Sequence, residues 1–205
     1  MPAAQISNPK LPLCVLGVDP AAAGATGYGV IESDGKTCRL LRFGALRPSS
    51  LDPDASSANL CAVHDLLSGL IAEFKPDGVA IEAVFSALNV KTALRLSEVR
   101  GVILLAAAQA NVPSFSYSPR QVKATVAGYG HAGKEQVQCM VRSLLGIGEI
   151  PQPEDASDAL AIALCHVQIA HFQARFGAQP SPWSGARRTV RRRNPPPEPR
   201  ASSLR

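Results

Sequence analysis

Three extended apolar segments follow one another near the start of the chain, before any segment with a helical pattern. The first is a continuous apolar run over residues 13–18, and the next two cover residues 28–32 and 38–46. The residues between the second and third, at positions 33–36, are Ser-Asp-Gly-Lys, which predicts a hairpin turn. An antiparallel three-stranded meander at the beginning requires a fold built around a sheet.

Helical and extended patterns alternate after this meander. Residues 59–74 are predicted to be helical because six apolar residues recur there at three- and four-residue steps. The further predicted elements are a strand at 79–82, a helix at 89–109, a strand at 114–117, and helices at 120–126, 134–145 and 155–172. The helix at 89–109 is apolar nearly all round after Gly101, so we expect its second half to be buried. This order predicts an α/β domain with a mixed five-stranded sheet flanked by helices.

Charge is distributed unevenly along the chain. Residues 176–205 contain seven arginines and one glutamate, a net charge of +6, whereas residues 1–175 contain 14 basic and 15 acidic residues. We expect a flexible leader over 1–12, one folded domain over 13–175 and a disordered Arg/Pro-rich basic tail over 176–205. Such a tail indicates a nucleic-acid partner, although similar tails also occur without a dedicated partner.

The cysteines and the hydropathy exclude several classes of protein. The five cysteines are widely spaced and include no CxxC pair, which indicates reduced thiols and a cytoplasmic protein. No run reaches the roughly 18 apolar residues of a membrane span, and the N-terminal apolar run, ended by Asp19, is too short for a signal peptide. His166 and His171 are five positions apart, which does not place them on one helix face, so we expect no zinc site.

Acidic residues stand where apolar elements begin or end. Asp19 and Glu82 end the strands at 13–18 and 79–82, and Asp155 and Asp158 lie on one face at the start of the last helix. A carboxylate buried at a strand end costs several kcal/mol unless it is paired or binds a metal. Each position also has a plain structural interpretation: a turn at Asp19-Pro20, a first exposed residue at Glu82, and favourable charges at a helix N-terminus.

Taken together, the four carboxylates indicate a divalent-metal site. Ligation by oxygen alone suits Mg²⁺, with Mn²⁺ as a substitute. Two such ions, about 4 Å apart, would stabilise the attacking and leaving oxygens of a phosphodiester displacement. Four negative charges would balance the four positive charges of two ions. The carboxylates therefore predict metal-dependent phosphodiester hydrolysis.

Six short motifs, in their order and spacing, resemble those of the RuvC family, the bacterial Holliday junction resolvases. The motifs are GVDP at 17–20, TGYGV at 26–30, IEAVF at 81–85, RQVK at 120–123, KEQVQCMVRSLL at 134–145 and DASDALAIA at 155–163. The resemblance runs from about Leu13 to His171 and implies an RNase H-like fold. It leaves the leader and the tail uncovered.

The resemblance also implies roles for individual residues. Asp19, Glu82, Asp155 and Asp158 match the four catalytic carboxylates of the family, which hold two Mg²⁺ ions per active site. Phe85 matches an aromatic residue that contacts unpaired DNA near the crossover, although a Phe beside a buried strand is also an ordinary core residue. Lys123 and Lys134 match basic residues at the scissile phosphate.

A dimeric, DNA-directed activity is implied as well. Members of the family are homodimers that nick two strands of a four-way junction symmetrically during recombination and DNA repair, and they work with the junction-binding and branch-migration proteins RuvA and RuvB. Two alternatives on the same fold are a nuclease acting on ribosomal RNA precursors and a catalytically impaired junction-binding protein. ATP-binding kinases and chaperones with this fold need a second comparable domain, for which 205 residues leave no room.

Two loops depart from familiar patterns. The family usually has DPG-x-x-x-TG after its first aspartate, whereas residues 19–27 are one residue longer, carry their glycine at position 24 and include no basic residue. Residues 128–134 fit GxxxxGK, the phosphate-binding loop of nucleotide-binding proteins, but Glu135 replaces the Ser or Thr that would bind Mg²⁺. The segment before this loop is predicted to be a helix and not a strand. A DNA-phosphate contact by Lys134 is therefore the better interpretation.

Overall fold

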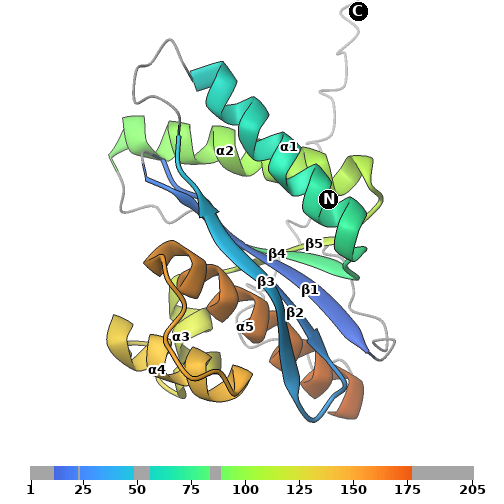
Figure 1. The fold of residues 1–205 in the computed structure, drawn as a ribbon. Helices are drawn as coiled ribbons and strands as arrows, with labels where there is room; N and C mark the ends of the chain where they lie inside the picture. The colour runs from blue at the N-terminus through green and yellow to red at the C-terminus, as the bar shows by residue number, and fades with distance from the viewer. Residues whose placement is uncertain (1–11, 23, 49–55, 84–88, 177–205) are drawn as a thin grey trace, which may run out of the picture.

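A five-stranded mixed sheet forms the middle layer of the protein (Figure 1). The computed structural model describes residues 12–22, 24–48, 56–83 and 89–176. The strands are β1 (Leu13–Asp19), β2 (Thr26–Ser33), β3 (Cys38–Leu46), β4 (Gly78–Glu82) and β5 (Ser114–Tyr117). Their order across the sheet is β3-β2-β1-β4-β5, with β1, β2 and β3 antiparallel and with β4 and β5 parallel to β1. The mixed five-stranded sheet predicted from the sequence is confirmed.

Helices cover both faces of this sheet. The helices are α1 (Ser56–Phe74), α2 (Val90–Gln109), α3 (Pro119–Ala127), α4 (Lys134–Leu145) and α5 (Glu154–Phe176). Helices α1 and α2 lie on one face, and α3, α4 and α5 lie on the other (Figure 1). None of the helices in the described ranges combines the length and apolarity needed to cross a membrane.

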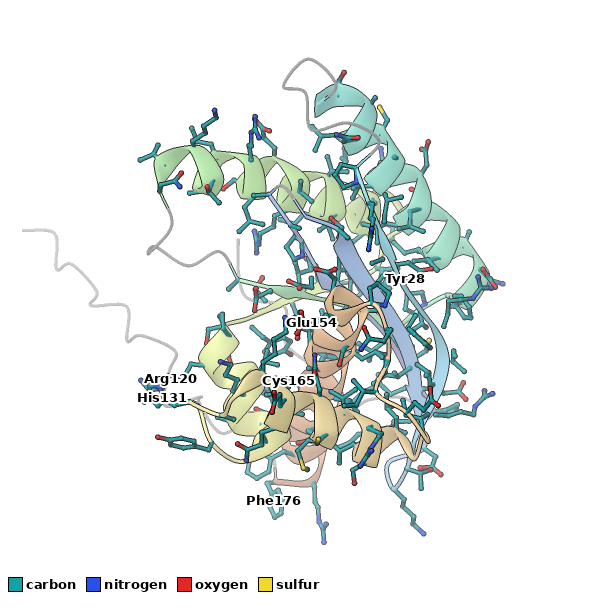
Figure 2. All side chains as sticks on the ribbon, turned by 60° about the vertical axis from the view of Figure 1, so that its left-hand side comes forward. Tyr28, Arg120, His131, Glu154, Cys165 and Phe176 are labelled. Carbon is teal, nitrogen blue, oxygen red and sulfur yellow. The ribbon has the colours of Figure 1, made fainter. Side chains whose placement is uncertain are left out.

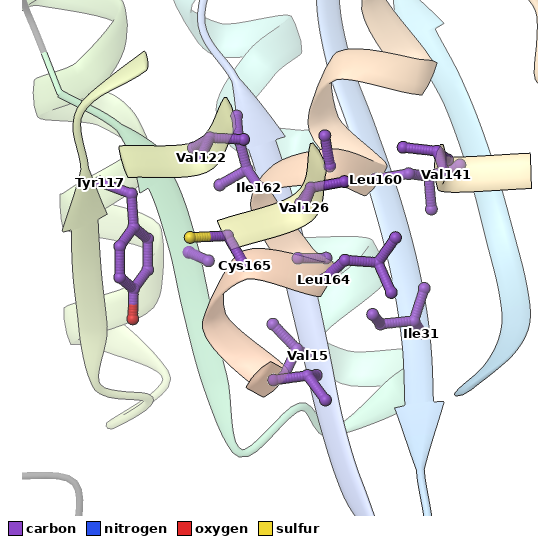
Figure 3. Packing of buried hydrophobic residues seen from close by; sticks show 14 of the residues in the cluster. Val15, Ile31, Tyr117, Val122, Val126, Val141, Leu160, Ile162, Leu164 and Cys165 are labelled. Carbon is purple, nitrogen blue, oxygen red and sulfur yellow. The ribbon is translucent and has the colours of Figure 1, made fainter. Parts of the chain in front are cut away.

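Strand β1 is apolar up to Asp19 because both of its faces are buried. Side chains alternate along a strand with a period of two. Leu16 therefore packs with Leu67 of α1 and Ile103 of α2, while Val15 packs with Leu160 of α5 on the opposite face. Figure 3 shows this second core between the sheet and α5. A strand covered on both sides reads as a continuous apolar run, which is the pattern at residues 13–18.

Helix α5 lies directly on β1 and β2 because glycines face it. A Cβ atom at Gly17 would collide with the carbonyl oxygen of Ala159 and with Ala163 one turn further on. A Cβ atom at Gly27 would collide with the carbonyl group of Asp155. These two glycines therefore fix the distance between the sheet and α5, and they place the first turn of α5 against the strands.

The structure corrects one prediction about α2. Ile103, Ala106 and Ala107 pack toward the core, but Leu94 is 61% exposed and Leu105 is 51% exposed on the outer side. The second half of α2 is therefore buried on one side only, because α1 and the sheet cover a single face of the helix. The expected leader (residues 1–12, of which only residue 12 is described) and the tail after residue 176 lie outside the described residues.

His166 lies in the core, beside two aromatic side chains. His166 is buried, and its Nδ1 atom lies 2.7 Å from the Tyr117 hydroxyl oxygen. Its ring also packs against that of Phe115, with ring centroids 4.4 Å apart and the ring planes tilted by 40°. Burial lowers the pKa of His166 to about 4, so this residue is a neutral core histidine. All five cysteines are free thiols.

Candidate active site

The parallel pairing of β1 and β4 brings two acidic residues together. Val18 is in register with Ile81, so Asp19 and Glu82 are the next residues along neighbouring strands. Val18 and Ile81 belong to the core under α1 and α2, and the period of two directs Asp19 and Glu82 to the opposite face. Both carboxylates therefore lie on the side of the sheet that α3, α4 and α5 cover.

The start of α5 lies over the same strand ends. Asp19 pairs across β1 and β2 with Gly27, and Gly27 faces the backbone of Asp155 in the first turn of α5. Asp158 is one turn further along the helix and shares a pocket with Asp19 and Glu82. Acidic residues from a first strand, a middle strand and the last helix thus meet at one end of the sheet.

The pocket has a cavity volume of about 180 Å³. Acidic and basic side chains share its lining with apolar ones. The lining residues are Asp19, Glu82, Pro119, Val122, Lys123, Lys134, Val137, Asp158, Ala161 and Ile162. Five of the seven side chains singled out in the sequence line this pocket. Asp155 is not among them but lies close enough for its charge to raise the pKa of Asp19.

Burial and mutual repulsion perturb the carboxylates. Burial, followed by the charges of Glu82, Asp158 and Asp155, raises the pKa of Asp19 to about 8, and Lys134 opposes this rise. The pKa values of Glu82 and Asp158 are also raised, in both cases first by burial. Desolvation and like charges disfavour ionised carboxylates, so the pocket holds too little positive charge to keep all of these acids ionised at neutral pH.

Two lysines supply part of that charge. Lys134, the first residue of α4, places its Nζ atom 3.1 Å from Asp158 Oδ2 and 3.0 Å from Glu154 Oε1. Lys123 on α3 lowers the pKa of Glu82, partly opposing the effect of burial.

The segment before the glycine-containing loop at residues 128–134 is helix α3, as predicted from the sequence. This sets the loop apart from the strand-loop-helix unit of nucleotide-binding proteins.

The donors in the pocket have the chemistry that a hard divalent cation prefers. Carboxylate oxygens are the usual protein ligands of Mg²⁺, and a bound cation would favour the ionised form of Asp19. Within the described residues, no group of three or more His, Cys, Asp and Glu side chains is already arranged to hold a metal ion. Lys134 instead pairs with Asp158. The donor set therefore fits a divalent ion, provided that the ion draws the carboxylates together.

Sequence reasoning missed two polar residues beside the pocket. Glu154 pairs with Lys134, and the Gln138 side-chain amide donates a hydrogen bond of 3.2 Å to Glu154 Oε1. Figure 2 labels Glu154 at the start of α5. Its position four residues before Asp158 is the one signal in the sequence that places it on the same face. Phe85, the predicted DNA-contacting aromatic residue, lies outside the described residues.

The raised pKa of Asp19 predicts a dependence of folding stability on pH. An aspartate in an unfolded chain has a pKa of about 3.9, so between about pH 4 and pH 8 the folded protein retains a proton that the unfolded chain releases. Without divalent metal, the free energy of unfolding should therefore fall as the pH rises from 5 to 8. Urea unfolding in the presence of a chelator measures this change.

The variant Asp19→Asn is the control for this prediction. In this variant the free energy of unfolding should fall much less between pH 5 and pH 8. The fall that remains should come from Glu82 and Asp158. An equal decrease in the variant and in the original protein would show that Asp19 does not titrate in this range.

Comparisons with known proteins give a consistent picture. Residues 15–166 match the family model "Crossover junction endodeoxyribonuclease RuvC". The crossover junction endodeoxyribonuclease RuvC of Natranaerobius thermophilus is 44% identical to this chain over 164 residues, which cover 80% of this chain and 100% of the relative. That of Chloroflexus aggregans is 46% identical over 162 residues, which cover 79% of this chain and 97% of the relative. The solved structure of Thermus thermophilus RuvC in complex with Holliday junction substrate matches with a TM-score of 0.73 and 36% identity, covering 79% of this chain and 97% of that one.

Proposed function

The chain belongs to the RuvC family of crossover junction endodeoxyribonucleases, and we propose that the pocket between β1, β4 and α5 is the site where it cleaves four-way DNA junctions. The family resemblance and the RNase H-like fold expected from the sequence are both confirmed. The observation that carries the placement of the site is the pocket itself, in which Asp19, Glu82 and Asp158 meet two lysines. The solved complex of the Thermus thermophilus relative with a Holliday junction supports four-way DNA as the substrate.

Hydrolysis by this family depends on metal, and we propose two Mg²⁺ ions per site, with Mn²⁺ as a substitute. Asp19, Glu82, Asp155 and Asp158 would hold them. When bound, the ions supply positive charge for the attacking water and for the departing 3′-oxygen of the DNA strand. The raised pKa values of Asp19, Glu82 and Asp158 support this proposal, because a buried group of acids needs a compensating charge.

The remaining residues of the pocket bind and orient the DNA. Lys123 and Lys134 bind the oxygens of the scissile phosphate and offset their charge. Val122, Val137 and Ile162 give the pocket an apolar wall, which lowers the local polarity and strengthens the electrostatic interactions beside it. We propose that Phe85, which follows β4, stacks on an unpaired base near the crossover.

The symmetry of the substrate supports a homodimer. A four-way junction contains two equivalent strands, and a two-fold symmetric enzyme presents two equivalent sites to them. The outer side of α2, with Val90, Leu94 and Leu105 between 51% and 76% exposed, is the surface we propose for the contact between two copies. We propose RuvA and RuvB as functional partners and the cytoplasm as the place of action. We also propose that the Arg-rich tail adds contacts to DNA phosphates. Such contacts carry no sequence information.

Cleavage of a synthetic four-way junction tests the proposed function. The full chain, with Mg²⁺, should introduce symmetric nicks into two strands of like polarity and should leave a linear duplex of the same sequence intact. Junction binding without nicking in Mg²⁺ or Mn²⁺ would favour the catalytically impaired binding protein. Cleavage of ribosomal RNA precursors without junction cleavage would favour the RNA nuclease.

A further inference from the structure

Four polar side chains of α4 and α5 form one network of ion pairs and hydrogen bonds beside the pocket. Lys134 and Gln138 are four residues apart on α4, and Glu154 and Asp158 are four residues apart on α5. Residues with this spacing lie on one face of a helix. The contacts between the two pairs show that these faces of α4 and α5 meet. Glu154 Oε1 receives hydrogen bonds from Lys134 at 3.0 Å and from Gln138 at 3.2 Å, and the other partner of Lys134 is Asp158.

The two acidic partners of Lys134 differ in their relation to the pocket. Asp158 lines the pocket, whereas Glu154 does not and has a side chain that is 55% exposed. A divalent ion at Asp158 would compete with the ammonium group for the same carboxylate. Lys134 would then keep Glu154 as its acidic partner on α5, and Gln138 fixes the orientation of that carboxylate.

An exposed ion pair contributes little to folding, typically less than about 1 kcal/mol. The pair between Lys134 and Glu154 is therefore a poor explanation for stability, but it restrains a long side chain. Without it, an ammonium group on a four-carbon chain would have more orientations and would lie at the edge of the pocket for a smaller share of the time.

We propose that Glu154 is a positioning residue that anchors Lys134 at the edge of the pocket when Asp158 engages a metal ion. Glu154 itself touches neither the metal nor the DNA in this scheme, and it acts through Lys134 alone. The inference rests on the role of Lys134 given under the proposed function. It adds an anchor residue, held by Gln138, to that function.

Glu154→Gln tests the inference, because it removes the charge and keeps the length of the side chain and an oxygen that can accept from Gln138. We expect kcat for junction cleavage to fall about two- to fivefold, because a restraint worth less than about 1 kcal/mol changes the population of the anchored lysine by no more than that, with KM nearly unchanged. In the double variant with Lys134→Met, cleavage should equal that of Lys134→Met alone, because Glu154 acts only through Lys134. Glu149→Gln, an exposed acid in the loop before α5, is the matched control and should cleave at the original rate.

A spectroscopic measurement without DNA gives a second readout. With ¹³C at lysine Cε, the Lys134 signal is the one that Lys134→Met removes. After Mg²⁺ is added to the original protein, the chemical shift of the Lys134 signal should remain distinct from those of exposed lysines. In Glu154→Gln it should move to the values of exposed lysines.

The outcomes separate this inference from the function on which it rests. An original cleavage rate in Lys134→Met would overturn the role of Lys134 and the inference with it. An impaired Lys134→Met combined with an unchanged Glu154→Gln, or with effects that multiply in the double variant, would overturn the anchor alone. A Lys134 signal that responds to Mg²⁺ identically with and without the Glu154 charge would also overturn it.

Discussion

Asp19→Asn and Asp158→Asn are expected to lower the rate of junction cleavage by about two to four orders of magnitude. Charge stabilisation by a bound metal is worth several kcal/mol, and each 1.36 kcal/mol changes a rate tenfold. An amide in place of either carboxylate removes one negative ligand from a set that has no surplus. Glu82→Gln and Asp155→Asn should act in the same direction. Single-turnover cleavage of a labelled junction in Mg²⁺ measures each rate.

Binding and folding controls accompany these rates. Junction affinity, measured by gel shift, should be retained because it arises mainly from phosphate contacts outside the carboxylate group. Asp19→Asn should also remain folded, since it removes an acid whose ionised form is disfavoured in the folded state. Asp65→Asn, on α1 across the sheet, removes one exposed charge and should cleave normally. Unimpaired cleavage by Asp158→Asn would reduce Asp158 to a surface partner of Lys134.

Gly17→Ala is expected to destabilise the protein by about 3 kcal/mol, which is at the upper end for overpacked sites. The added Cβ atom meets the backbone of Ala159, and backbone in the middle of a helix cannot rotate away as a flexible side chain can. Either α5 moves outward or β1 bends, and both loosen the core that contains Val15 and Leu160. For a domain of this size, thermal unfolding followed by circular dichroism should show a midpoint lower by roughly 6–12 °C.

Gly69→Ala is the matched control on α1. A Cβ atom at Gly69 meets nothing within 4 Å, so alanine at this position should leave stability unchanged or increase it through its higher helix propensity. Equal stability of Gly17→Ala and Gly69→Ala would show that α5 does not depend on close approach to β1.

The sheet could be predicted because its signals are local. The continuous apolar run of β1, the hairpin after β2 and the helical periodicities each follow from short segments, and together they give the observed order of elements. The exposure of Leu105 could not be predicted in the same way. An apolar residue in an apolar helix carries no local sign of which face the neighbouring elements leave uncovered.

The positions of Asp19 and Glu82 at strand ends were readable from the sequence, but their common face follows from the parallel register of β1 and β4, which pairs Val18 with Ile81. The role of Glu154 was not readable, because its partners Lys134 and Gln138 belong to another helix. Contacts between helices depend on how they pack, which no local pattern in either helix specifies.

The acids of the pocket come from opposite ends of the folded region, with Asp19 on the first strand and Asp158 on the last helix. During synthesis the N-terminal part of a chain emerges first. The β1–β3 meander can therefore form on the ribosome while it holds only one acid of the set. Under the proposed function, cleavage requires α5 to dock against the glycines of β1 and β2, because Asp158 shares the pocket with Asp19 only in that position. A copy whose α5 has not docked should therefore lack an assembled carboxylate site and leave DNA uncut.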